Sequence, residues 1–395
     1  MKGIAKPIDA PEFDFQGAVC PTPLRQDQHI LLGHGGGGKL SAELVEQVIA
    51  PEFANDHVRS MEDSTIVPVA GTRIAMSTDS YVVQPLFFPG GDIGQLAVHG
   101  TINDLAMSGA TPKYLTTGFV IEEGFAIDDL RRIARSMGQA AKRAGVAIVA
   151  GDTKVVQRGH GDGVYINTAG VGFIDEEIQI HSSGARVGDV VIVSGPIGNH
   201  GMAIMSVREG LEFESPIQSD TADLSAMVRS MLIAARTPKG SQAPEGSRTF
   251  DGSQTLDGSQ TFDGSQTLGG SAIRVMRDPT RGGLSTSLNE IASSSRVGIE
   301  IDEAAIPIDD PVRGACEFLG LDPMEVANEG KLVAIVAPDR ADAILQAMRS
   351  HCIGEAAKII GEVTADPNHL LVGRTALGAR RVITMPIGEQ LPRIC

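Results

Sequence analysis

The last residue of the chain, Cys395, places a nucleophilic side chain where it could serve as a covalent carrier. A thiolate attacks electrophiles readily and forms covalent intermediates. The segment before it contains Pro386, Gly388 and Pro392, which disfavour a helix, and residues 386–395 could extend to about 33 Å. We therefore expect a mobile tail that moves an attached group between two sites. The alternative is an incidental thiol; prenylation would need the cysteine fourth from the end.

Four aspartates stand in short polar motifs beside apolar runs. They are Asp63 in MEDS, Asp79 in STDS, Asp104 in INDLAMSGATP and Asp278 in DPTRGG. Each alone is typical of a turn residue or a helix cap. Together they offer oxygen ligands of the kind that Mg²⁺ takes from strand ends and loops when it binds with a nucleotide.

A glycine-rich turn supplies a second element suited to phosphate. It comprises Gly35, Gly36, Gly37, Gly38 and Lys39. The run fits both GxGxxG and the start of a P-loop, but consecutive glycines satisfy many patterns. A P-loop also needs Ser or Thr directly after the lysine, and this chain has Leu40 there. We expect a loop that closes over a nucleotide, with a merely flexible turn as the alternative.

The elements that must position these residues form a first α/β lobe, expected over 29–175. Alternation predicts strands over 72–79 and 145–152, and helical spacing of apolar residues predicts a helix over 126–145. The segment 29–49 has the pattern of a strand, the glycine turn and an amphipathic helix. Before this lobe, residues 1–28 are predicted to form an irregular arm.

A second α/β lobe is expected over 184–385. It contains a strand followed by a glycine turn over 184–198, a strand over 331–338 and a helix over 339–351. Its insert, 239–271, holds the hexapeptide repeat EGSRTF DGSQTL DGSQTF DGSQTL. Each copy has one large apolar residue, too few to offset the entropy of ordering, so a flexible surface loop is favoured over a small β-coil.

Composition and charge exclude several function classes. With 395 residues and 42% hydrophobic residues, the chain can bury the cores of two domains. Its formal net charge of −16 argues against nucleic-acid or anionic-membrane partners, which need a basic face. We find no apolar run of about 20 residues and no signal-peptide core, so a cytoplasmic location is expected. The four cysteines show neither a CxxC pair nor zinc spacing.

The order of the motifs resembles that of one protein family. The motifs are GHGGGGKL, MEDS, STDS, INDLAMSGATP, GDTK, DPTRGGL, NEGKL and the terminal PRIC. Together they resemble the HypE family of carbamoyl dehydratases in [NiFe]-hydrogenase maturation. More widely, the chain is similar to the superfamily of aminoimidazole ribonucleotide (AIR) synthetase, selenophosphate synthetase and thiamine-monophosphate kinase. The resemblance implies an α/β (α+β) fold of two tandem AIR-synthase-like domains and a homodimer formed through the N-terminal domain.

The resemblance also implies roles for individual residues. Magnesium and the phosphates of ATP would be held by the four aspartates, and the triphosphate covered by the glycine loop. Nucleotide or metal contacts would come from Asn103 and Asp152. The dehydration step would use Lys154 of GDTK and Glu329 of NEG, although each residue type at such a place is more often an ordinary solvated side chain.

The implied reaction begins with a HypF-like carbamoyltransferase that loads a carbamoyl group on the Cys395 sulfur. ATP would then activate the carbonyl oxygen, and loss of phosphate would leave a thiocyanate for a HypC–HypD-like iron scaffold complex. Two alternatives stay open from the sequence. The chain could be a small-molecule kinase or synthetase of the same superfamily, for which Cys395 would be dispensable, or a non-catalytic scaffold for maturation proteins.

Overall fold

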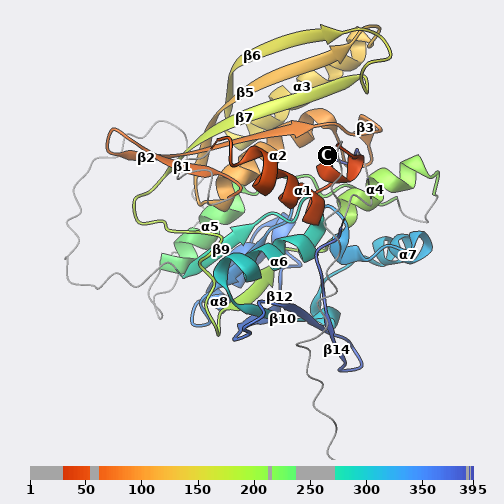
Figure 1. Ribbon diagram of the computed structural model, residues 1–395. Helices are drawn as coiled ribbons and strands as arrows, with labels where there is room; N and C mark the ends of the chain where they lie inside the picture. The colour runs from red at the N-terminus through yellow and green to blue at the C-terminus, as the bar shows by residue number, and fades with distance from the viewer. Residues whose placement is uncertain (1–29, 54–61, 212–215, 237–271, 388–390, 392) are drawn as a thin grey trace, which may run out of the picture. The chain divides into compact units, whose positions relative to one another are not determined.

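The computed structural model describes residues 30–53, 62–211, 216–236, 272–387, 391 and 393–395, and residues 32–395 belong to one compact unit (Figure 1). The arm 1–28 and the repeat insert 239–271 lie outside the described residues, so their predicted conformations stay predictions. No helix in the described part of the chain is both long and apolar enough to cross a membrane.

The first lobe is built on a sheet whose described strands run in the order β1-β2-β7-β5-β6. The bounds are β1 Thr65–Val69, β2 Thr72–Tyr81, β5 Thr111–Glu122, β6 Ala147–Val156 and β7 Val164–Ile174, with a small separate hairpin of β3 Phe87–Phe88 and β4 Gly91–Asp92. Neighbouring strands are antiparallel except β5 and β6, which are parallel and joined through a helix. That connection leaves β6 at an edge of the sheet.

One face of this sheet is covered by the helices α2, Ile93–Met107, and α3, Ile127–Ala144. Asp92 caps α2 by accepting hydrogen bonds from the backbone of its first turn, and Gly145 ends α3 in the left-handed conformation. Helix α3 has charged residues on its outer side, whereas α2 is buried almost all round because the second lobe packs against it. Helix α2 therefore carries Asn103 and Asp104 into the centre of the molecule.

The second lobe has a sheet with its described strands in the order β14-β13-β10-β12-β8-β11-β9. The strands are β8 Val190–Val193, β9 Ile273–Arg277, β10 Gly298–Asp302, β11 Val333–Val336, β12 Lys358–Thr364, β13 Leu371–Arg374 and β14 Arg380–Val382. The helices are α4 Asn199–Arg208, α5 Ser225–Arg236, α6 Gly283–Ser295, α7 Asp310–Leu319 and α8 Ala341–Arg349. Strand β11 is buried on both faces, and its alternate residues enter two different cores.

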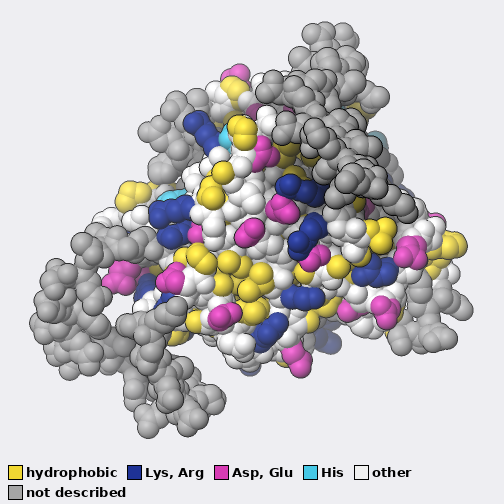
Figure 2. Space-filling model, turned by 90° about the horizontal axis from the view of Figure 1, so that it is seen from below, with side chains coloured by type: hydrophobic (Ala, Val, Ile, Leu, Met, Phe, Trp, Pro, Cys, Tyr) yellow, Lys and Arg dark blue, Asp and Glu magenta, His cyan; other side chains and the backbone are white. Residues whose placement is uncertain are grey.

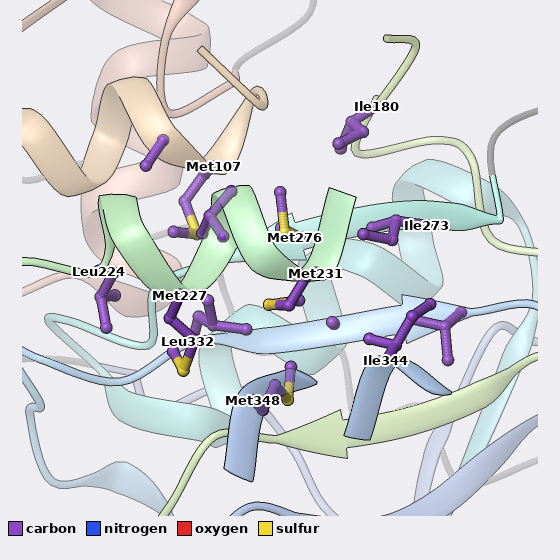
Figure 3. Packing of buried hydrophobic residues seen from close by; sticks show 14 of the residues in the cluster. Met107, Ile180, Leu224, Met227, Met231, Ile273, Met276, Leu332, Ile344 and Met348 are labelled. Carbon is purple, nitrogen blue, oxygen red and sulfur yellow. The ribbon is translucent and has the colours of Figure 1, made fainter. Parts of the chain in front are cut away.

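A methionine-rich cluster joins the two lobes (Figure 3). Met107 of α2, Met227 and Met231 of α5, Met276 of β9 and Met348 of α8 pack together there. Because unbranched methionine side chains fill irregular space, they suit a junction between two separately built sheets. On the face in Figure 2, acidic and basic side chains are interspersed with apolar ones.

Most of the predicted elements are confirmed. The expected strands lie in β2, β6, β8 and β11, and the expected helices are α3 and α8. The strand predicted before the glycine turn is wrong: Ile30 and Leu31 are exposed and belong to none of the described strands, and a 3-10 helix, Leu32–Gly35, follows. The predicted amphipathic helix is present as α1, Gly38–Leu44, continued by a π-helical turn, Val45–Ile49.

Candidate functional site

The structure brings the four predicted aspartates together at the junction of the lobes. Asp79 lies near the end of β2, Asp104 in α2, Asp278 directly after β9, and Asp63 before β1. Burial raises the pKa of Asp104 well above its usual value, and the negative charges of the other three raise it further. Ser77 donates a hydrogen bond of 2.6 Å to its carboxylate. Mutual repulsion of this kind marks a place where a cation would be stabilised.

Two arginines lie against this acidic cluster. Arg277 forms ion pairs of 3.1 Å with Asp63 and 2.5 Å with Glu290, and its charge partly offsets the effect of burial on Asp278. Burial still raises the pKa of Asp278 from 3.8 to about 6. The cluster therefore holds more negative charge than its arginines neutralise.

Arg281 connects the acidic cluster to the glycine turn and to the end of the chain. Its guanidinium lies 3.4 Å from Asp79 Oδ1 and donates a 3.1 Å hydrogen bond to the carbonyl oxygen of Gly35. Negative charge at Cys395 is the largest cause of the raised pKa of Arg281. The charge of Asp79 raises this pKa further. The sequence analysis missed Arg281, although it stands inside the DPTRGG motif that was singled out for Asp278.

The glycine turn packs against the turn that carries Arg281. Gly37 and Gly38 have φ values of 77° and 71°, a region that suits glycine. A Cβ on Gly37 would overlap the backbone of Arg281, and one on Gly38 would overlap the carbonyl oxygen of Pro386. The same oxygen accepts a 3.0 Å hydrogen bond from the backbone N–H of Lys39. Close backbone approach thus requires glycine here.

The described residues of the tail are docked rather than extended into solvent. Cys395 is partly buried, the Ile394 side chain is 3% exposed, and Val82 N donates a 3.2 Å hydrogen bond to the Cys395 carbonyl oxygen. Arg393 pairs with Asp162 at 3.1 Å. None of the described tail residues lies in a helix, as the proline and glycine content predicts. That content gives no information on the buried hydrophobic contact of Ile394 that holds the tail in place.

Cys395 opens into a cavity of about 310 Å³. Its walls include the glycine turn with Gly35 and Gly36, the second glycine turn with Arg281 and Gly282, and the tail itself. The rest of the lining is Ser80, Val82, Asp162, Glu325 and Ala327. The thiol-bearing residue therefore shares one cavity with the loop expected to cover phosphate.

Glu329 is the buried carboxylate on the second-lobe side. Burial raises the pKa of Glu329 well above its usual value, and the charges of Asp79 and Asp278 add to the effect. Asn103 fixes its backbone, because its amide donates 2.9 and 3.3 Å hydrogen bonds to Ala222 O and Glu329 O. Asn103 thus has a structural part in the site; its predicted nucleotide contact stays a prediction.

Comparison with known proteins places this geometry in a family. The AIR synthase related N-terminal and C-terminal domain models match residues 61–174 and 263–373. Carbamoyl dehydratase HypE of Rhizobium leguminosarum bv. viciae is 51% identical over 92% of this chain and 94% of its own length. HypE of Escherichia coli strain K12 is 40% identical over 93% and 99%. The chain belongs to the HypE family.

Solved structures agree with HypE membership. A crystal structure of a HypE–HypF complex superposes with a TM-score of 0.75 at 44% identity and covers 87% of this chain and 99% of that one. HypE in complex with ATP gives 0.71 at 42% identity, covering 93% and 100%. Thiamine monophosphate kinase from Aquifex aeolicus, at 16% identity and 0.57, shares the fold. The predicted family and tandem AIR-synthase-like domains are confirmed.

Two residues that the HypE resemblance assigned to the site, Lys154 and Asp152, lie elsewhere in the single chain. Both are exposed on the edge strand β6, and β5 and β7 separate them from Asp79 on β2. In register, Asp152 stands opposite Gly118, which stands opposite Asn167. One chain alone therefore does not bring Lys154 to the cavity that holds Cys395.

Magnesium would suit the acidic cluster as a shared site rather than a closed cage. Among the described residues, no three His, Cys, Asp or Glu side chains converge closely enough to hold a metal ion by themselves. Mg²⁺ is commonly bound by one or two carboxylates with substrate phosphates and water completing its shell. Asp63, Asp104 and Asp278, whose pKa values are raised by burial and by neighbouring negative charges, fit that mode.

Proposed function

We propose that this chain is an ATP-dependent carbamoyl dehydratase that converts a carbamoyl group on the Cys395 sulfur to a thiocyanate. The product would supply the cyano ligands of a [NiFe]-hydrogenase iron. The relatives named carbamoyl dehydratase HypE support the activity, and the relative crystallised with ATP supports the nucleotide. The observation that carries the proposal is the docking of Cys395 in one cavity with Arg281 and the glycine turn.

The chemistry explains why these groups surround the sulfur. An oxide ion is a poor leaving group, so the carbonyl oxygen of the thiocarbamate first takes the γ-phosphoryl group of ATP. Phosphate then leaves while two protons leave nitrogen, giving thiocyanate, ADP and phosphate. Arg281 would stabilise negative charge on the transferring phosphoryl group. Magnesium, when bound with ATP, would neutralise the remaining phosphate charge, and Asp63, Asp79, Asp104 and Asp278 would hold it.

Glu329 would accept a proton from the thiocarbamate nitrogen. A general base works best when its pKa is near the working pH, and burial raises the pKa of Glu329 in that direction. Its removal from water also strengthens any contact that it makes with substrate. Glu329 is 4% exposed, so it is largely shielded from water.

A homodimer would account for Lys154 and Asp152. The face of the first sheet that α2 and α3 leave open carries exposed apolar residues, among them Met76, Tyr114 and Phe173. Such a row on a sheet face is typical of an interaction surface. We infer that two copies associate through this face, which would bring Lys154 of each chain to the nucleotide site of the other.

The partners follow from the same reaction. The HypE–HypF complex among the relatives supports a HypF-like carbamoyltransferase as the source of the carbamoyl group, and a HypC–HypD-like iron scaffold complex would accept the cyano group. The need for ATP favours the cytoplasm as the location. A small-molecule kinase or synthetase of the same superfamily is the alternative, since thiamine monophosphate kinase has the same fold.

Intact-protein mass spectrometry tests the proposal. The protein is incubated with carbamoyl phosphate, Mg-ATP and a HypF-like partner, and samples are quenched at intervals, because the ATP used for loading also drives dehydration. We expect a gain of about 43 Da that falls to about 25 Da, the masses of the two adducts of this covalent mechanism. Cys395→Ala should bind ATP normally and form neither adduct. A kinase or synthetase would show no adduct and would be indifferent to Cys395→Ala.

A further inference from the structure

Two side chains of α4 grip the backbone at the very end of the chain. His200 Nε2 lies 2.9 Å from the carbonyl oxygen of Ile394. Arg208 donates from Nη2 to the carbonyl oxygen of Arg393 and from Nε, at 2.6 Å, to that of Gln84. The contacts therefore reach the two carbonyl groups directly before Cys395.

The tail lies along the segment that follows β2 as a short antiparallel pair. Gln84 N donates to Arg393 O at 3.1 Å, and Val82 N donates to Cys395 O at 3.2 Å. Arg208 bonds to a carbonyl on each side of this pair, so it holds the two segments together. Ile394, between the bonded residues, is buried in the core of the first lobe.

The protonation of His200 is fixed by its neighbours. A carbonyl oxygen can only accept, so Nε2 must carry the proton that bonds Ile394 O, and Nδ1 accepts from Ser219 Oγ at 2.8 Å. The ring is fully buried. Burial lowers the pKa of His200 and outweighs the opposite effect of the Asp220 charge, so the ring is neutral. The ring also meets Phe88 edge-on, with centroids 5.5 Å apart.

The same loop that orients His200 also holds Glu329. Asp220, next to Ser219, accepts a 3.2 Å hydrogen bond from Glu329 N and lies 3.8 Å from Lys331 Nζ. Residues 219–220 therefore connect the docked tail to the backbone of the proposed base through three hydrogen bonds, which join Ile394 to His200, His200 to Ser219, and Asp220 to Glu329.

We propose that His200 and Arg208 are positioning residues that hold the tail inward and align the Cys395 sulfur for the dehydration step. Neither residue touches the reacting atoms. Because a transferase must reach the thiol away from this cavity, they are not needed for loading. This role rests on the proposed function, and it adds the residues that set the position of the Cys395 sulfur.

Separating the two half-reactions tests the proposal. Each variant is mixed with carbamoyl phosphate, Mg-ATP and the HypF-like partner, and intact masses at successive times give the rate at which the adduct of about 43 Da forms and the rate at which it becomes the adduct of about 25 Da. For His200→Ala and Arg208→Met we expect conversion of the 43 Da adduct to the 25 Da adduct to slow by about fivefold to tenfold, because the first variant loses one buried hydrogen bond to the tail and the second loses the exposed bonds of Arg208 to Gln84 and Arg393. Loading should proceed at the wild-type rate or faster.

A conservative variant and a matched control complete the design. His200→Gln keeps an N–H donor for Ile394 O and should recover most of the dehydration rate. His351 forms a comparable 2.9 Å contact with Ser230 Oγ far from the tail, so His351→Ala should change neither half-reaction. Thermal unfolding and ATP affinity of each variant report whether the fold is intact.

Equal slowing of loading and dehydration, or unchanged dehydration in folded His200→Ala and Arg208→Met, would overturn the positioning role. Failure of the wild-type protein to form either adduct would instead overturn the proposed function. If His200→Ala does not fold, the comparison of Arg208→Met with His200→Gln still decides the question.

Discussion

Replacing Asp278 by asparagine should stabilise the nucleotide-free protein, although it removes a residue that the reaction needs. Burial raises the pKa of this carboxyl from 3.8 to about 6. The folded chain therefore binds the proton more tightly than the unfolded chain does, and ionisation destabilises the fold. At 1.36 kcal/mol per pKa unit, the cost above pH 6 is about 3 kcal/mol.

The sign of the pH dependence makes the test sharp. The cost is fully present above about pH 6, about half of it remains at pH 5, and it vanishes below the unfolded pKa near 3.8. Asparagine is neutral throughout. The gain from Asp278→Asn should therefore be about 3 kcal/mol at pH 8 and about half of that at pH 5.

Urea unfolding of the nucleotide-free protein between pH 5 and pH 8 measures this gain. Asp339→Asn is the matched control, because Asp339 is exposed and should leave the unfolding midpoint unchanged at every pH. ATP with magnesium should then stabilise the wild-type protein more than Asp278→Asn. Lower stability of Asp278→Asn at pH 8, or a gain that does not shrink as the pH falls, would refute the argument that the acidic cluster stores unfavourable charge.

Three further outcomes follow from the site. Gly38→Ala should weaken ATP binding by at least about tenfold in calorimetry, because the new Cβ would overlap a backbone carbonyl oxygen. Gly314→Ala, which has open space around the new Cβ, should leave ATP binding unchanged, and equal effects of the two variants would contradict this. Arg281→Met should slow ATP-dependent dehydration about a hundredfold in phosphate release without changing loading; normal turnover would exclude its role. Mixing Lys154→Ala with Glu329→Ala chains should restore about a quarter of wild-type turnover, because about half of the dimers are mixed and each mixed dimer has one intact site of its two. No recovery of turnover would contradict a site shared between chains.

Local patterns were sufficient to predict most elements of the fold. The alternation in β2 and the apolar spacing in α3 reflect one buried face each, and such faces are visible in the sequence. The run ending at Leu31 has the same apolar character, but its described residues belong to no strand, because strand formation depends on residues distant in the chain. The aspartates were found because polar residues at the ends of buried segments are conspicuous.

What the sequence concealed was spatial order. Nothing in GDTK reveals that β6 becomes an edge strand, which places Lys154 on the far side of β5 and β7. Nothing in the sequence of the tail reveals that the Ile394 side chain is buried. Nor does it reveal that His200 and Arg208, nearly 200 residues earlier, bind the backbone of the tail. Arg281 was within a recognised motif, yet its part in the site becomes apparent only when Gly35 and Asp79 are seen beside it.

The contacts that hold the tail also explain how one site can act on a group that changes. His200, Arg208 and the backbone of Val82 and Gln84 form their hydrogen bonds with the tail at its main-chain carbonyl oxygens. These bonds are the same whether the sulfur carries a proton, a carbamoyl group or a cyano group, so the tail is bound in the same way whichever group is attached. In the cavity, Arg281 lies near the negative charge of Cys395 and would meet the attached group. Each hydrogen bond contributes about 1 kcal/mol, so the tail can be released between reactions, as a carrier requires.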